Sequence, residues 1–136
     1  MHGINIWSGS RELKGLGAAL TNPTELSFHK GSIIRHYPVE FRGVVYPDAE
    51  AAYQRNKSMG GDNLALMAQI ICAKLLQHPL LLQVVDKVGG LTFLEQCEHK
   101  TWARTERFQW WEGKGYDSPF IRTLIEGYKM AKAQTP

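Results

Sequence analysis

The sequence contains little cysteine and lacks a long uninterrupted apolar run. Only two of its 136 residues are cysteine, Cys72 and Cys97, and both lie in apolar stretches. Secreted domains of this size often carry more cysteine, so we expect two buried thiols and a reducing, cytoplasmic environment. The most apolar stretch, residues 64–85, is interrupted by polar side chains and by Pro79, so it predicts two soluble helices and no membrane span. No charged segment leads into an apolar run near Met1, and we expect no signal peptide.

A large excess of one charge is also missing. Sixteen basic and 13 acidic residues give a formal net charge of +3, which is far below that of a dedicated nucleic-acid-binding protein. Cys97 and His99 have no second pair of ligands at a suitable spacing, so we expect no metal site and no cofactor. The glycines in Gly113–Gly115 do not have the spacing of a phosphate-binding loop.

The composition is that of one globular domain. Hydrophobic residues make up 43% and charged residues 21% of the chain, which has no internal repeat, low-complexity run or linker. A length of 136 residues suits a single hydrophobic core. We therefore expect one domain over residues 1–136.

Short β-prone segments precede a series of helices. Residues 4–7 favour a strand, residues 8–37 suggest a long irregular loop, and residues 39–46 predict two short strands that turn at Arg42–Gly43. Helix-start signals such as Pro47, Asp62 and Pro79, and glycine pairs that end helices, then mark the helical segments. The expected helices cover residues 47–58, 62–77, 79–89, 91–99 and 118–132, with residues 100–117 irregular. The sum is a mainly helical α+β domain with a small antiparallel sheet.

The first of these helices carries the most informative polar residues. Side chains three and four positions apart share a helix face, so Glu50, Tyr53, Gln54 and Lys57 should lie on one side. A carboxylate, a phenol, an amide and an amine on one face suit a polar substrate, although an exposed, solvated face explains the same spacing. Glu50 lies near the positive end of the helix dipole and should stay ionised unless it is buried.

Several segments, in order along the chain, resemble one family. Residues 43–50, Gly-Val-Val-Tyr-Pro-Asp-Ala-Glu, are similar to a Gly-x-x-(Tyr/Trp)-Pro-(Ser/Thr)-x-Glu junction between a strand and a helix, and Gln54 and Lys57 follow on that helix. Further similar segments are Ile4–Trp7, Leu20–Asn22, Ala73–Pro79 and Trp111–Gly115. Together they resemble the NADAR family, also called YbiA-like proteins.

The resemblance implies an N-glycosidase, a hydrolase that cleaves ribosyl–nitrogen bonds. Substrates known in the family include early riboflavin-pathway intermediates, which carry a phosphoribosylamino group, and ADP-ribose attached to guanine in nucleic acid. Glu50 matches the catalytic carboxylate, and the residues expected to bind substrate are Asn22, Tyr53, Gln54, Lys57, Trp111 and Asp117. The expected partner is therefore a nucleotide-like small molecule or ADP-ribosylated nucleic acid.

The pocket walls depart from the family pattern more than the helix does. Pro23 replaces an aromatic residue, about 14 residues are inserted at positions 24–37, and the segment 59–63 lacks a tryptophan. Glu112 stands where glycine is usual, and the Asn expected before the last helix is replaced near Asp117–Ser118. Two alternatives therefore stay open: a module that binds ADP-ribose or a modified nucleotide without turnover, and, on charge alone, a nucleic-acid accessory protein.

Aromatic and basic residues supply further candidates. Trp7, Trp110 or Trp111 could stack on the departing base, whereas Trp102 and Phe108 are expected in the core. Arg55 or Lys57 could contact a substrate phosphate. The basic residues Lys100, Arg104, Arg107 and Lys114 suit either phosphate contacts or a solvated surface.

Overall fold

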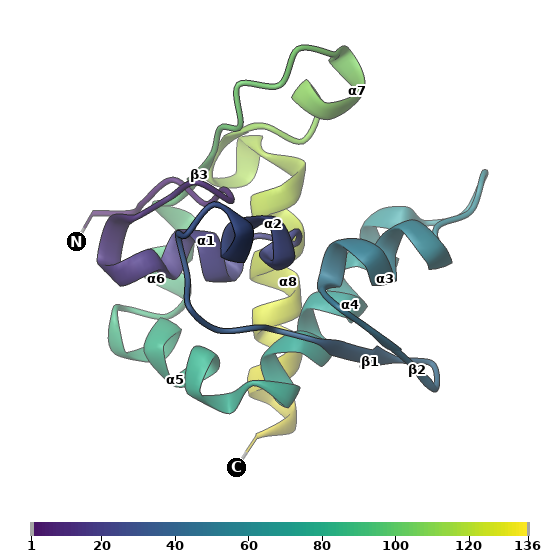
Figure 1. Ribbon diagram of the computed structural model, residues 1–136, viewed down its shortest axis with the longest axis horizontal. Coiled ribbons are helices and arrows are strands. Elements are labelled where there is room, and N and C mark those ends of the chain that lie inside the picture. The colour runs from purple at the N-terminus through teal and green to yellow at the C-terminus, as the bar shows by residue number, and fades with distance from the viewer. Residues whose placement is uncertain (1, 136) are drawn as a thin grey trace.

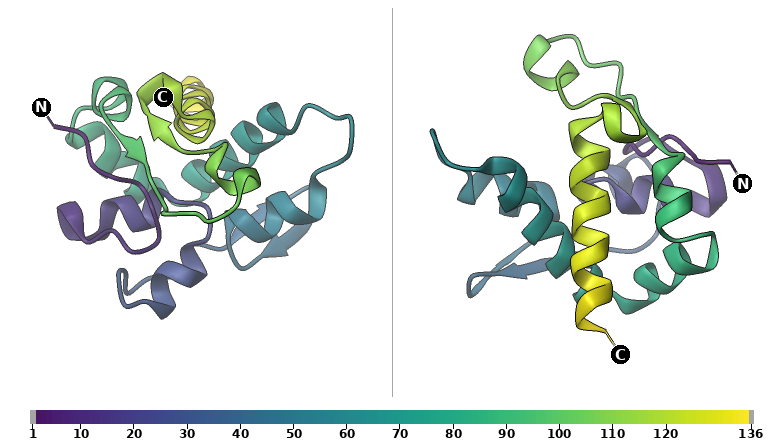
Figure 2. Two further views of the ribbon diagram at one scale, coloured as in Figure 1. Left: turned by 90° about the horizontal axis from the view of Figure 1, so that it is seen from above. Right: turned by 180° about the vertical axis from the view of Figure 1, so that it is seen from behind.

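In the computed structural model, which describes residues 2–135, a long C-terminal helix runs along one face of the fold, behind the other elements in Figure 1 and in front of them in the right view of Figure 2. This helix, α8 (Pro119–Gln134), begins at Ser118, whose Oγ accepts a hydrogen bond from Ile121 N at 3.1 Å. Gly127 lets α8 pack closely, because an added Cβ there would lie 2.6 Å from Ile71 Cγ2. One apolar stripe of α8 is buried, and it consists of Phe120, Ile121, Leu124, Ile125 and Tyr128.

The most apolar stretch folds into two helices, as predicted. α4 (Asn63–Gln77) begins after Asp62, whose Oδ1 accepts a hydrogen bond from Ala65 N at 2.9 Å, and packs against α8. α5 (Pro79–Lys87) follows at a sharp bend. No single helix within residues 2–135 is long and apolar enough to span a membrane, and only the α4–α5 pair, bent by 98°, passes that test together. The two cysteines are buried and unpaired.

The predicted helix over residues 91–99 is wrong in its second half. α6 (Leu91–Glu95) ends early, and the chain then forms strand β3 (Glu98–His99). Glu98 pairs with the N-terminal segment: its N–H donates to Ile4 O at 3.0 Å, and its carbonyl accepts from Ile6 N at 2.8 Å. These contacts across more than ninety residues override the local helical preference.

Two small antiparallel sheets complete the α+β fold. β1 (Val39–Phe41) and β2 (Val44–Tyr46) form the predicted hairpin, with Val39 opposite Tyr46. Arg42 and Gly43 both have positive φ, 52° and 81°, as a two-residue type I′ turn requires. In the second sheet, β3 pairs with β4 (Gly113–Lys114).

The stretch over residues 8–37 is more ordered than predicted. It contains the 3₁₀-helix η1 (Glu12–Gly15) and two short helices, α1 (Leu16–Leu20) and α2 (Thr24–His29). Each is too short to be stable alone or to show a clear periodicity, and burial of α1 in the core stabilises it instead.

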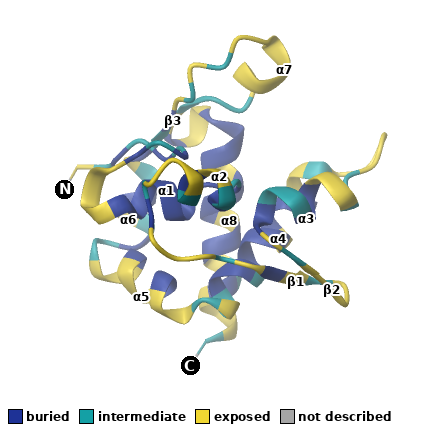
Figure 3. Cartoon of the chain, viewed as in Figure 1, coloured by how far each residue is buried: buried dark blue, intermediate teal, exposed yellow. Residues whose placement is uncertain are grey.

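Residues 100–112 form an arm that projects from the body of the protein (Figures 1 and 2). The arm contains the short helix α7 (Glu106–Gln109), and η2 (Gly115–Asp117) follows it. Trp102 and Phe108 are 59% and 52% exposed, so their prediction as core residues is wrong. Figure 3 shows the reason, since most of the arm is exposed and offers no interior for them.

Candidate functional site

A cavity of about 420 Å³ lies beside α3 (Ala49–Asn56). Its other walls come from the α1–α2 loop, from α2, from the N-terminal segment around Trp7 and from the arm, with single residues from α4, β3 and α8. A volume of this size is typical of small-molecule sites.

The polar face of α3 lines this cavity through Glu50, Tyr53 and Gln54. Lys57 also contributes to the wall, but it is the extended residue that follows α3, so the helix ends before the predicted residue 58. The helix begins slightly later than expected, because Asp48 is its N-cap and accepts a hydrogen bond from Ala51 N at 2.9 Å. Pro47 therefore precedes the helix. The shift leaves Glu50 in the first turn, where the helix dipole acts on its carboxylate.

Glu50 is partly buried, and this changes its acidity. Burial raises the pKa of its carboxyl above the ordinary glutamate value, and nearby Asp48 adds to the increase. Gln54, whose Nε2 lies 3.5 Å from Glu50 Oε2, and Lys57 act in the opposite direction but are outweighed. A carboxylate with a raised pKa holds a proton more readily and is a stronger general base.

Asn22 lines the cavity and carries a buried polar atom without a partner in the described part of the chain. Its side chain is only 4% exposed, and its Oδ1 has no hydrogen-bond partner among residues 2–135. Leaving a buried acceptor unpaired costs about 1–3 kcal/mol, so a donor on a ligand would be favourable here. The backbone of Asn22 is tied to α3, because its carbonyl accepts a hydrogen bond from Glu50 N at 3.2 Å.

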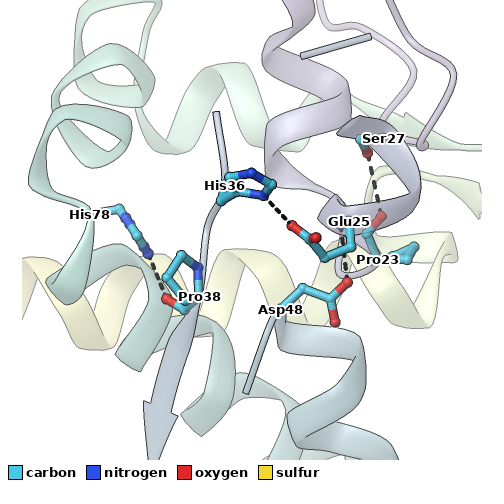
Figure 4. Close-up of polar contacts among 7 residues, drawn as sticks. All are labelled: Pro23, Glu25, Ser27, His36, Pro38, Asp48 and His78. Carbon is cyan, nitrogen blue, oxygen red and sulfur yellow. Dashed lines mark hydrogen bonds and ion pairs between the residues drawn. The ribbon is translucent and has the colours of Figure 1, made fainter. Parts of the chain in front are cut away.

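Two buried charged residues hold the Asn22 loop against α3. Asp48 caps α3 and also accepts a hydrogen bond on Oδ2 from Glu25 N of α2 at 3.1 Å (Figure 4). Lys74 of α4 is fully buried, and its Nζ donates to the carbonyls of Ala19 at 2.6 Å and Thr21 at 2.8 Å. Burial lowers the pKa of Lys74 to about 7, although Asp48 opposes the change. These contacts position Asn22 and Glu50 in one cavity.

Aromatic rings form part of two walls. Trp111 packs edge-on against Tyr53, with ring centroids 6.0 Å apart, and both rings line the cavity. Trp7 lines it as well and packs against Trp102 at 4.9 Å. Trp110 is 55% exposed and does not line the cavity. Trp7 and Trp111 therefore remain as the rings available for stacking.

The cavity wall is rich in cations. Within residues 2–135, three basic side chains line it, Lys30, Lys57 and Arg107, against the single carboxylate of Glu50. The Lys30 ammonium donates to Ser8 Oγ at 2.6 Å and lies 4.8 Å from the centroid of the Trp7 ring. This surplus of positive charge suits a phosphate-bearing ligand. The other basic candidates are exposed and lie outside the cavity: Arg55, Lys100, Arg104 and Lys114.

Asp117 does not join this site. It is exposed in η2 and lies outside the cavity wall, so its prediction as a substrate-binding residue is not matched by the geometry. The next residue, Ser118, caps α8 and accounts for the local structure in this segment.

Lys30 and His99 line the cavity although sequence reasoning did not assign them to it. Lys30 directly follows α2 and His99 lies on β3, and no local pattern connects either residue with α3. The pairing of β3 with the N-terminal segment, which places His99, shows only in three dimensions.

The described residues contain no group of three or more His, Cys, Asp or Glu side chains placed to hold a metal ion. Searches of protein-family models, of curated proteins and of solved structures gave no significant match to the chain.

Proposed function

We propose that the protein is an N-glycosidase that hydrolyses a ribosyl–nitrogen bond, with Glu50 as its catalytic carboxylate. The proposal rests on the set of side chains that line one cavity. The cavity combines a partly buried carboxylate of raised pKa, an unpaired amide on Asn22, the Tyr53–Trp111 aromatic pair and three cations. The resemblance of the α3 region to NADAR proteins points to the same chemistry.

Cleavage of such a bond builds positive charge on the ribose, by analogy with other glycoside hydrolyses. The Glu50 carboxylate stabilises that charge and accepts a proton from the attacking water. The water oxygen bonds to the anomeric carbon, and the bonding pair of the broken carbon–nitrogen bond leaves with the base. Asn22 bonds a sugar hydroxyl or a base edge, and Trp111 or Trp7 stacks on the departing base.

The cationic wall supports substrates that carry phosphate. Both candidate classes do so: ADP-ribose attached to guanine in nucleic acid, and a phosphoribosylamino intermediate of the riboflavin pathway. Release of free base from these two substrates by the purified protein tests the proposal.

A binding module is the second candidate. Pro23 lines the cavity where the family has an aromatic residue, so part of the substrate wall is altered. Under this alternative the cavity holds ADP-ribose or a modified nucleotide without turnover. Tight binding of ADP-ribose together with intact substrate after prolonged incubation would favour it.

Replacing Lys57 with alanine should raise KM about tenfold and change kcat little. A phosphate or hydroxyl contact of its ammonium acts equally on the bound substrate and on the transition state. Arg55→Ala is the matched control, because Arg55 lies only two residues before Lys57, at the end of α3, but outside the cavity. Steady-state kinetics of both variants measure the effect. An equal rise of KM in Lys57→Ala and in Arg55→Ala would contradict the role of Lys57.

The proposed reaction uses a carboxylate and a water molecule as its reacting groups. We therefore expect kcat/KM to stay within about twofold after extensive dialysis against EDTA. Activity that EDTA removes and zinc or magnesium restores would show that the mechanism is wrong.

A further inference from the structure

His99 occupies the part of the cavity that the proposed chemistry leaves unassigned. It lies on β3, is only 9% exposed, and lines the cavity together with Glu50 and Lys30. Its ring packs on that of Phe120 from α8, with centroids 4.5 Å apart. The imidazole is therefore held between the core and the cavity, with little freedom to turn.

A backbone hydrogen bond determines which ring nitrogen of His99 carries the proton. Nδ1 lies 2.6 Å from Ile6 O, and a carbonyl can only accept, so Nδ1 donates. Among residues 2–135, no group forms a hydrogen bond with Nε2. In the neutral ring, Nε2 is then an unprotonated acceptor.

The surroundings of His99 favour the neutral ring. Burial lowers its pKa below the ordinary histidine value, while the bond to Ile6 and the charge of Glu112 act in the opposite direction and are outweighed. Glu112 does not bond the ring, because its Oε2 accepts hydrogen bonds from Thr101 N and Oγ1 instead. The other titratable groups in the cavity wall are Lys30, Glu50, Tyr53, Lys57 and Arg107, and the packing partners Ile6 and Phe120 are uncharged.

We propose that His99 is a specificity-determining residue whose Nε2 accepts a hydrogen bond from a ribose hydroxyl of the ligand. The proposal rests on the proposed function for the class of ligand. Ribose hydroxyls are the donors common to every candidate substrate, whereas the base differs between them. A buried acceptor of fixed orientation favours ligands that carry the matching hydroxyl, because a ligand without it leaves the acceptor unpaired.

Binding of ADP-ribose, measured by calorimetry in a Glu50→Gln background, tests this role. That background removes both turnover and the titration of the cavity carboxylate. His99→Met keeps an apolar side chain of similar length but has no nitrogen acceptor, and we expect affinity to fall at least about tenfold. His99→Gln can place an amide oxygen near the position of Nε2, and we expect affinity within about threefold of the parent at neutral pH.

The dependence of the affinity on pH distinguishes a hydrogen bond to His99 from a role of His99 in packing alone. As the pH falls from about 8 to 5, Nε2 of the parent becomes protonated and turns from acceptor to donor, so affinity should drop. The amide introduced by His99→Gln does not titrate, so this variant should lose the drop. The His99→Gln variant also keeps the proposal testable if His99→Met does not fold. Thermal unfolding will show whether His99→Met folds.

Three results would overturn the role of His99. These are unchanged affinity in a folded His99→Met variant, an unchanged pH course in His99→Gln, and no binding of ADP-ribose by the parent. The test is separate from that of the hydrolase. Binding that depends on His99 without cleavage of any N-glycoside would contradict the hydrolase alone, and cleavage that is insensitive to His99 would contradict this inference alone.

Discussion

Replacing Glu50 with glutamine should lower kcat by at least about 10²-fold while the affinity for ADP-ribose changes less than about threefold. The amide keeps the shape of the side chain but cannot accept the proton from water or stabilise positive charge on the ribose. Turnover of N-glycoside substrates and calorimetric binding of ADP-ribose give the two numbers. Glu126→Gln is a matched control, because Glu126 is exposed on α8 and lies outside the cavity.

The pH profile of the unaltered protein provides a second readout for Glu50. The carboxylate works in its ionised form, so activity should fall as the pH decreases through its pKa. Because burial raises that pKa, the acid limb should lie above the ordinary glutamate value. An acid limb at or below that value would show that the protonation of a group other than Glu50 causes the loss of activity.

A fully active Glu50→Gln variant would contradict the mechanism itself. Neither Asp48 nor Asp117 is placed to replace Glu50 in the reaction. Both carboxylate oxygens of Asp48 accept hydrogen bonds from backbone N–H groups, and Asp117 lies outside the cavity wall. Glu50 is the only carboxylate that lines the cavity within residues 2–135.

Replacing Lys74 with alanine should destabilise the fold by about 2–4 kcal/mol at mildly alkaline pH. The change removes the donor for the carbonyls of Ala19 and Thr21 and leaves a cavity beside them. For a domain with a stability of about 5–15 kcal/mol, this is a large fraction. Urea unfolding measures the loss. Lys74→Met fills more of the space and should lose less, and Lys129→Ala, at an exposed position of α8, should lose little.

The stability should also depend on pH through Lys74. Its folded pKa is about 7 and its ordinary value is 10.5, so between these values the unfolded chain binds more protons than the folded protein. Stability therefore rises with pH in this window, by up to about 1.4 kcal/mol per pH unit. Lys74→Met should lose this rise. If the parent and Lys74→Met follow the same pH course, Lys74 does not change its protonation on folding.

Elements with strong local signals were predictable from the sequence. The caps Asp62 and Ser118 mark the starts of α4 and α8, and Arg42–Gly43 marks the hairpin turn. The two short helices within residues 8–37 and strand β3 were missed. Burial in the core or pairing with distant backbone stabilises these elements, and neither leaves a periodic pattern in so few residues.

The residues of the candidate site likewise divide into those with a local signal in the sequence and those placed by long-range packing. Side chains on one helix face were predictable from their spacing, as Glu50, Tyr53 and Gln54 show, whereas Lys57 lines the cavity from an extended residue just after the helix. Asn22 came from a resemblance, and the structure places it in the same cavity wall. His99 and Lys30 enter the wall through long-range packing, and the sequence carries no signal for either. Lys74 lies in the most apolar stretch of the sequence, yet its buried amine bonds two carbonyls.

Hydrolysis in water labelled with the heavy oxygen isotope shows directly whether the protein cleaves a ribosyl–nitrogen bond with water. The protein is incubated with guanine-linked ADP-ribose in DNA or with a phosphoribosylamino substrate, and the products are analysed by mass spectrometry. We expect free base without label and a released sugar that carries one labelled oxygen at its anomeric carbon. Substrate that is bound but remains intact, or label that appears in a phosphate group instead, would contradict the proposed hydrolysis.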